Sequence, residues 1–362
     1  MKKISFLVLV LVFALCLPLL AACGSGTNGG EETTEKELVA SEGLEYYPLP
    51  DGTYAVASGT AQYLEEIIIP KEYMDKEVTV IVENAFKNCA NLKRITIPDS
   101  VTSIGNSAFN GCSGLTSIVF GENSQLTSIG NLAFSGCGGL TSIVFGENSQ
   151  LKSIGDWAFG YCYSLTSITI PDSVTSIGSD AFYGCYTLIE IYNLSSLNIT
   201  AGLSNNGSVG YYAKNVYTDE SVASKFVEKD GYIFYCDDDA SEYYLMRYTG
   251  SDTELILPDD INGHNYKIYH YTFYDRDDIT SVAILSDVTS ISMRAFENCS
   301  NLTSITIPDS VMGIGHYAFN DCSSLTTVYY MGSEEEWAAI GVGSGNSCLT
   351  DATIVYNYVP EE

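Results

Sequence analysis

The chain has 362 residues, enough for two or three ordinary domains, and its composition is 46% hydrophobic and only 17% charged. This balance supports a folded protein, and the many Ser, Thr, Gly, Asn and Tyr residues favour β structure and turns over helical bundles. A formal net charge of −29 argues against a nucleic-acid partner, because binding to phosphates depends on basic side chains. The acidic residues are spread along the chain, which is typical of a surface kept soluble by charge.

The first residues predict an export signal, since Lys2 and Lys3 precede an apolar run from residue 4 to 20. The sequence LAAC that ends at Cys23, followed by Gly24, resembles the lipobox of bacterial lipoproteins. The resemblance implies cleavage before Cys23 and attachment of diacylglycerol to its thiol; a plain secretory peptide is the alternative. No later stretch is apolar enough to span a bilayer.

The segment that follows, residues 23–42, contains few large apolar side chains and is expected to be a flexible tether. Together, the signal at residues 1–22 and the tether predict an extracytoplasmic protein. It would be anchored to the bacterial cell membrane through Cys23 and displayed at the cell surface.

One segment, AFNGCSGLTSIVF or a close variant, recurs along the chain, and its phenylalanines are spaced 23 or 25 residues apart within each group. These repeat phenylalanines are Phe86, Phe109, Phe134, Phe159 and Phe182, then Phe296 and Phe319. The two longer units carry FGENSQL where the shorter units carry IPDSV, which places two extra residues in one turn.

Each unit contains one strand-like run, as in LTSIVF, then a second apolar pair, a glycine and a tight helical turn at Ala-Phe. A unit of this length cannot bury its own Leu, Ile, Phe and Cys, but coils stacked about 4.8 Å apart bury them against their neighbours. The pattern therefore predicts a repeat solenoid, mainly β with short helical turns, with 23 to 25 residues per coil.

The units resemble the BspA-type leucine-rich repeats of bacterial surface antigens, over about residues 66–194 and 255–357. The closing sequence, MGSEEEWAAI into TIVYN, is similar to the end unit of such proteins, and Ser333 with Glu336 has capping-box spacing. The resemblance implies a surface, adhesin-like role.

Two segments open the repeat blocks in similar ways, with two strand-like runs and a third that ends at Pro70 or Pro258. We interpret them as β-hairpin caps that cover the edge of a first coil. The expected order is an N-terminal β cap (43–65), repeat module 1 (66–194), an irregular hairpin cap segment (195–254), repeat module 2 (255–332) and a C-terminal cap (333–362).

Seven cysteines fall three residues after a repeat phenylalanine and should line up inside the solenoid: Cys89, Cys112, Cys137, Cys162, Cys185, Cys299 and Cys322. Export permits disulfides between neighbouring coils, but stacked free thiols are favoured because a small buried apolar group suits such a ladder. One Cys per coil without nearby His does not predict a zinc site. Cys236 and Cys348 lie outside the ladder.

The candidates for catalysis or metal binding are weak. His264, His270 and His316 belong to no recognisable nucleophile motif, so no catalytic residue, enzyme activity or cofactor is predicted. The run Asp237, Asp238, Asp239 with Glu242 is either a calcium site or, preferably, a solvated turn, and Asp275, Asp277 and Asp278 rank lower.

Aromatic residues replace small or polar ones around the repeat phenylalanine in two adjacent coils. They are Trp157, Tyr161, Tyr163, Tyr183 and Tyr186, with Tyr192 on the next strand. Tyr and Trp suit protein or sugar recognition, so these residues are candidate binding residues. Alternatively, they pack beneath the following cap segment, which contains Tyr211, Tyr212 and Tyr217.

Outward Thr and Ser positions would form polar ladders along one face, which β propensity alone also explains. They are Thr116, Ser117, Thr141, Ser142, Thr166, Ser167, Thr303 and Ser304.

The sequence favours a surface-displayed, adhesin-like binding protein that recognises an extracellular protein or glycan of unknown identity. Three alternatives stay open: an envelope scaffold that binds polysaccharide, a spacer without a ligand, and, less favoured, a hydrolase within residues 195–270.

Overall fold

The computed structural model describes residues 39–146, 148–219, 221–222, 224–236, 242–285 and 288–360. The predicted export signal, Cys23, most of the tether and Asp237 to Asp239 lie outside the described residues. Ala40–Glu362 is one compact unit. Among the described residues, no helix has both the length and the apolar character needed to cross a membrane.

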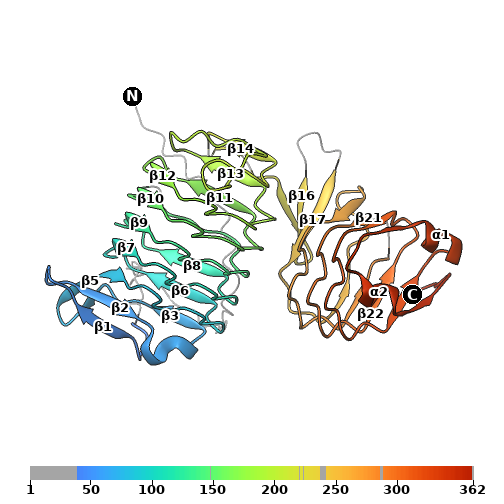
Figure 1. The fold of residues 1–362 in the computed structure, drawn as a ribbon, viewed down its shortest axis with the longest axis horizontal. Coiled ribbons are helices and arrows are strands. Elements are labelled where there is room, and N and C mark those ends of the chain that lie inside the picture. The colour runs from blue at the N-terminus through green and yellow to red at the C-terminus, as the bar shows by residue number, and fades with distance from the viewer. Residues whose placement is uncertain are drawn as a thin grey trace, which may run out of the picture. The chain divides into compact units, whose positions relative to one another are not determined.

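Most coils of the first module carry one longer and one shorter strand, and equivalent strands of most successive coils pair in parallel. The longer strands are β6 (Arg94–Ile97), β8 (Ser117–Phe120), β11 (Ser167–Ile170) and β13 (Glu190–Asn193); the shorter are β7 (Ser103–Ile104), β9 (Ser128–Ile129), β10 (Ser153–Ile154) and β12 (Ser176–Ile177). Between β7, β9, β10 and β12, serine pairs with serine and isoleucine with isoleucine. The repeat thus sets the register, and the predicted solenoid is confirmed (Figure 1).

An antiparallel hairpin opens the first module. It consists of β1 (Glu45–Pro48) and β2 (Tyr54–Ala57). Strand β2 pairs in parallel with β5 (Lys76–Ile81), and β5 in turn pairs in parallel with β7. A 3-10 helix, η1 (Gly59–Tyr63), then leads to β3 (Glu66–Ile68), the edge strand beside β6, while β4 (Glu72–Tyr73) forms a second small hairpin with β5. The hairpin covers the edge that the first coil would otherwise expose.

The second module begins in the same way. Strands β15 (Phe226–Lys229), β16 (Tyr232–Cys236) and β17 (Tyr243–Tyr248) are antiparallel, and β17 is followed in parallel by β19 (Tyr266–Ile268), β21 (Val288–Ile291), β23 (Gly313–Ile314) and β25 (Gly341–Val342). A second parallel sheet contains β18 (Glu254–Ile256), β20 (Ser281–Ala283), β22 (Ser304–Ile307), β24 (Thr327–Tyr330) and β26 (Thr353–Val355). Both modules therefore start from an antiparallel hairpin.

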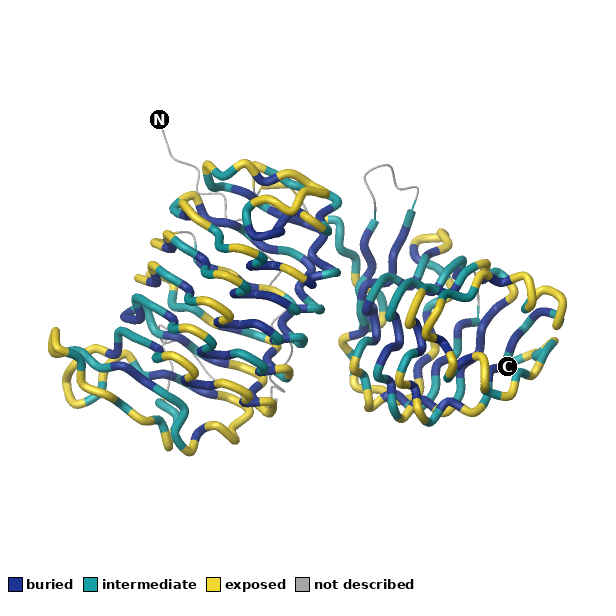
Figure 2. The backbone as a smooth tube through the Cα atoms, viewed as in Figure 1, coloured by how far each residue is buried: buried dark blue, intermediate teal, exposed yellow. Residues whose placement is uncertain are grey.

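The repeat phenylalanines form two internal stacks, with successive ring centroids 4.8 to 5.3 Å apart. One stack runs from Phe86 to Phe182 and the other from Phe273 to Phe319, and none of these rings is exposed to solvent. Phe273 stacks on Phe296 and is therefore the repeat phenylalanine of the first coil in the second module. Buried residues accordingly follow the inside of every coil (Figure 2).

The Ala-Phe segments form turns rather than the helical turns that the sequence suggests. In every coil the residues two before and two after the repeat phenylalanine have left-handed backbone, for example Asn84 (φ 57°) and Asn88 (φ 60°) around Phe86. A left-handed residue ends any α-helix, because the next turn cannot continue the hydrogen-bond ladder. The Phe86 N–H instead donates to the carbonyl of Ala108 in the next coil.

Two stretches depart from the expected pattern. Residues 140–146, although they repeat LTSIVFG, form no strand, so the longer strands of module 1 divide into two sheets. Conversely, β14 (Asn215–Tyr217) pairs in parallel with β13 and adds a rung beyond the expected end of module 1 at residue 194. The segment 215–217 lacks the Leu, Cys and Phe of the repeat, which is why the sequence did not indicate it.

The C-terminal cap contains α1 (Glu334–Ala339) and α2 (Ser347–Thr350). The predicted capping box is confirmed, since the Ser333 hydroxyl accepts from the Glu336 N–H and the Glu336 carboxylate accepts from the Ser333 N–H. Trp337 of α1 packs edge-on against Tyr330, with ring centroids 5.1 Å apart. The helix thereby covers the last strands of the stack.

Candidate functional site

Residues at the same distance from the repeat phenylalanine in successive coils stack into columns, and two columns hold the unusual aromatic residues. Trp157 (φ 55°) occupies the column of Asn84, and Tyr161 (φ 59°) that of Asn88. Left-handed backbone suits Gly and Asn and is an outlier for bulky side chains, at a cost of about 1–3 kcal/mol each. Aromatic rings are thus placed where the backbone disfavours them.

Three of the candidate binding residues form a cluster that reaches the solvent, which we call the aromatic patch: Trp157, Tyr161 and Tyr183. The Trp157 ring centroid lies 5.8 Å from that of Tyr161 and 5.1 Å from that of Tyr183, and the two tyrosines are 5.7 Å apart. Tyr183 is 41% exposed, whereas Trp157 and Tyr161 are half-buried. The patch therefore presents a preformed surface of ring faces and edges.

Two glycines make room for these rings. A Cβ at Gly160 would lie 3.0 Å from Cε3 of Trp157, and one at Gly184 would lie 2.7 Å from Cδ1 of Tyr161. Any other residue at Gly184 would have to displace the Tyr161 ring, and its φ of 77° would strain a side chain as well. Glycine at these two positions therefore leaves the space that the Trp157 and Tyr161 rings occupy.

Two other candidates, Tyr163 and Tyr186, pack against the first coil of the second module. Their rings lie parallel to that of Tyr271, at centroid distances of 5.2 and 4.2 Å, and Tyr163 also contacts Tyr274 at 4.7 Å. Burial raises the pKa of the Tyr163 and Tyr271 hydroxyls. Of the residues expected to cover them, Tyr212 contacts Tyr186 at 4.9 Å. The aromatic patch therefore reaches the solvent, whereas Tyr163 and Tyr186 pack against Tyr271 of the second module.

Tyr192 lies beside a buried carboxylate. Its hydroxyl donates to Glu190 (3.3 Å), which also accepts from the Ser224 hydroxyl and the Lys225 N–H, both at 2.9 Å. Glu190 is fully buried, and burial raises its pKa in spite of these donors. Tyr192 and Glu190 therefore hold the segment that leads into β15.

The cysteine ladder is built from free thiols with a common partner. In six coils the Sγ donates to the carbonyl of the repeat phenylalanine one coil earlier, at 2.9 to 3.3 Å: Cys112, Cys137, Cys162, Cys185, Cys299 and Cys322. Burial raises the pKa of Cys299 to about 12 and that of Cys137 further. These thiols are placed for packing and hydrogen bonding rather than for nucleophilic chemistry.

The threonines of the outward ladder also bond within the fold. The hydroxyls of Thr116, Thr141 and Thr303 donate to backbone carbonyls of the preceding coil, at 3.0, 3.5 and 2.9 Å. Because those donors are used internally, the ladder stabilises the stacking of coils.

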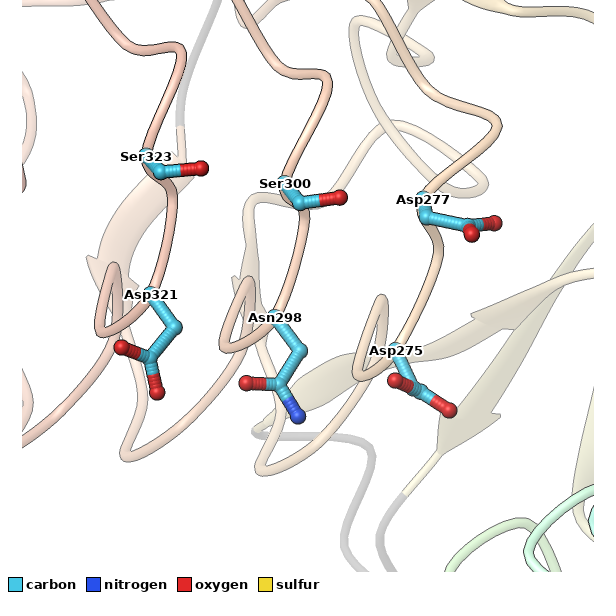
Figure 3. A pocket seen from close by; sticks show the side chains of 6 residues that line it. All are labelled: Asp275, Asp277, Asn298, Ser300, Asp321 and Ser323. Atoms are coloured by element: carbon cyan, nitrogen blue, oxygen red, sulfur yellow. The ribbon is translucent and has the colours of Figure 1, made fainter.

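A shallow hollow of about 390 Å³ lies on the same Ala-Phe side of the second module and is lined only by polar side chains (Figure 3). The lining residues, from three successive coils, are Asp275, Asp277, Asn298, Ser300, Asp321 and Ser323. The hollow contains two of the acidic residues singled out in the sequence, whereas the third, Asp278, pairs with Arg276. Asp321 was missed, although it is in the column of Asp275. In the described residues no group of three acidic, His or Cys side chains is placed to hold a metal.

The histidines occupy three separate places. His264 stacks on Tyr243 at 4.9 Å, and His316 accepts the Ser344 N–H at its Nδ1. Burial lowers the pKa of His270, whose ring contacts Tyr269 edge-on at 4.7 Å. The Ser344 hydroxyl also lies 3.0 Å from His316 Nδ1, at the atom that accepts the Ser344 N–H.

Comparison with known proteins identifies the repeat family through a family model. A family model for the BspA type leucine rich repeat region matches residues 61–217 and 260–343, in six copies, and so extends past residue 194 to include β14. A leucine rich cell surface protein from Faecalibacterium prausnitzii is 24% identical, with 85% of this chain and 98% of that chain covered and a TM-score of 0.40. A leucine-rich repeat protein from Bacteroides ovatus is 23% identical (88% and 99% covered, TM-score 0.37), and one from T. pallidum is 20% identical (79% and 90%, TM-score 0.38). No curated protein matches the chain.

Proposed function

Because this chain belongs to the BspA-type leucine-rich repeat family, we propose that it is a non-enzymatic binding protein displayed at the bacterial cell surface. It recognises an extracellular protein or glycan, in the manner of an adhesin. The observation that supports this proposal is the aromatic patch, where Trp157 and Tyr161 keep a disfavoured left-handed backbone while Tyr183 stays 41% exposed. Exposed, rigid aromatic side chains are enriched where proteins bind partners.

The binding test uses the purified chain from Gly24 onward, which retains every residue that the structure describes, on an array of extracellular-matrix proteins and glycans. The patch variant carries Trp157→Asn, Tyr161→Gly and Tyr183→Ser, each taken from an equivalent position in another coil. A control variant, Tyr63→Ser, changes a tyrosine that is 72% exposed elsewhere.

We expect saturable binding by the parent and the control, and at least about a ten-fold loss in the patch variant, equivalent to about 1.4 kcal/mol. Circular dichroism and thermal unfolding must show that all three are folded. If the folded parent binds nothing on the array, or if the patch variant binds equally well, a spacer or scaffold role replaces the proposal.

The lipobox-like sequence at Cys23 supports the part of the proposal that anchors the chain to the membrane for display. In a bacterial host, Cys23→Ala should abolish incorporation of labelled fatty acid and release the chain from the membrane fraction. Protease added to intact cells should degrade the parent. Retention of the label in the variant, or protection of the parent from protease, would contradict this part of the proposal.

A further inference from the structure

The second module shows how the column of Trp157 binds a cation. Tyr271, Arg294 and Tyr317 occupy that column in three successive coils, all with left-handed backbone. The Arg294 guanidinium carbon lies 5.0 Å from the ring centroid of Tyr317 and 6.0 Å from that of Tyr271. An arginine thus sits between two aromatic rings of the column, as expected for cation–π contacts.

The charge of Arg294 is neutralised within the same site. Its Nη1 donates to both carboxylate oxygens of Glu297, at 2.9 and 2.6 Å, and Glu297 is only 6% exposed. The complete arrangement is therefore a guanidinium held by aromatic faces on two sides and by a carboxylate. Lys214 lies over the Tyr244 ring in a similar way, at 4.2 Å.

In the first module the same column holds a single ring, Trp157, and an acidic residue takes the place of the arginine one coil later. Tyr183 occupies the position that corresponds to Glu297. Trp157 in the column is followed one coil later by Asp180, and Asp156 directly precedes Trp157. Asp156 is exposed and Asp180 half-buried, and in the described part of the chain neither forms an ion pair with a lysine or arginine. These two carboxylates are thus neighbours of Trp157 in the sequence and in the column, and among the described residues no lysine or arginine is paired with them. Asp156 Oδ1 accepts the Ser179 N–H, and the Ser208 hydroxyl donates to Asp180 Oδ1 at 3.4 Å.

From this relationship we infer that the aromatic patch binds an arginine-bearing segment of a protein partner, with Asp156 and Asp180 matching its positive charge. The inference rests on the proposed function and names the partner's chemistry. Arginine suits the site because its planar guanidinium both stacks on aromatic rings and donates to carboxylates. The strongly acidic chain also attracts basic segments over longer distances, which speeds their encounter.

The test measures binding of a fluorescent (Arg-Gly)₄ peptide to the chain from Gly24 onward by anisotropy. A (citrulline-Gly)₄ peptide has nearly the same shape without the charge. Two variants probe the site: Trp157→Asn with Tyr161→Gly, which leaves the net charge unchanged, and Asp156→Asn with Asp180→Asn. The charge control is Glu334→Gln with Glu335→Gln, which removes two exposed carboxylates from α1.

These substitutions are compatible with the fold. The Oδ1 atoms of Asn131 and Asp156 accept N–H groups one coil further along, so an amide can replace the Asp156 carboxylate. Asparagine also occupies the column of Trp157 and Asp180 at Asn84, with φ of 57°. We therefore expect thermal midpoints no lower than that of the parent for Trp157→Asn.

The parent should bind the arginine peptide saturably and the citrulline peptide about ten-fold more weakly or not at all. The ring variant should lose about ten-fold in affinity, and the Asp156 and Asp180 variant more than its charge control. Equal binding by parent and ring variant, or by both peptides, would overturn the inference. If the patch variant loses binding to a neutral glycan on the array but not to the arginine peptide, the proposed function stands and this inference falls; if nothing depends on the patch, both fall.

Discussion

The thiol of Cys137 donates a hydrogen bond of 3.2 Å to the carbonyl oxygen of Phe109, one coil earlier in the same module. That carbonyl also accepts the Cys112 N–H within its own turn, at 3.2 Å. The cysteine therefore links two coils by a side chain to backbone contact as well as by packing. This relationship recurs in both modules and accounts for a cysteine at this position of the repeat.

If the thiol acts as a donor, Cys137→Ser should retain more stability than Cys137→Ala, although serine is the more polar residue. Alanine loses the hydrogen bond and leaves a small cavity in a fully buried site, at a cost of about 1–3 kcal/mol. Urea unfolding of both variants beside the parent measures the difference. A serine variant less stable than the alanine variant would show that the thiol serves only as an apolar filler.

Burial raises the pKa of five ladder thiols, which predicts that they resist alkylation: Cys112, Cys137, Cys162, Cys299 and Cys322. A thiol whose pKa is raised, such as that of Cys299 at about 12, holds very little thiolate at pH 8. Iodoacetamide on the folded chain from Gly24 should therefore modify Cys236 and Cys348, which are half-buried, long before these five thiols. Mass spectrometry identifies the modified residues.

The same reagent after unfolding without reductant decides between free thiols and disulfides. The sequence has 11 cysteines, of which Cys16 and Cys23 precede Gly24, so nine should react if all are free. Pairs that react only after reduction would contradict the free ladder.

The period of 23 or 25 residues was enough to predict the solenoid and to align the Phe and Cys positions of successive coils, because each coil repeats one set of apolar positions. The partners of Tyr163 and Tyr186 could not be predicted in this way. Tyr271 belongs to the other module, and no periodicity relates residues on opposite sides of an irregular segment. By contrast, Asp321 of the polar hollow could have been found by counting columns from Asp275.

Glu190 predicts a pH dependence of stability. Burial raises its pKa in the folded state, so the folded chain binds this proton more tightly than the unfolded chain. Its contribution is fully present below the pKa of the unfolded state and is lost as the pH rises through the folded pKa, at about 1.4 kcal/mol per unit of difference. Relative to Glu190→Gln, the parent should therefore gain stability as the pH falls from 7 to 4. Urea unfolding across this range measures the difference, and a constant difference would contradict the assignment.

Asn346 ends the stack of coils by replacing a missing neighbour. Its Oδ1 accepts the Phe319 N–H at 2.9 Å, the bond that a backbone carbonyl of the next coil makes elsewhere, and its Nδ2 donates to the carbonyls of Gly315 and Gly343. The residue is only 3% exposed, so Asn346→Ala leaves these groups unpaired and should cost about 2–4 kcal/mol.

Asn346→Asp separates the acceptor function of Oδ1 from the donor function of Nδ2. A carboxylate still accepts the Phe319 N–H, but at neutral pH it places negative charge against the Gly315 and Gly343 carbonyls without a proton to donate. The aspartate variant should therefore be less stable than the alanine variant at pH 7 and should recover at pH 4, where the carboxyl gains a proton. Thermal unfolding at both pH values measures this reversal. If aspartate is as stable as asparagine at pH 7, the amide donor contributes nothing and the Oδ1 contact alone closes the solenoid.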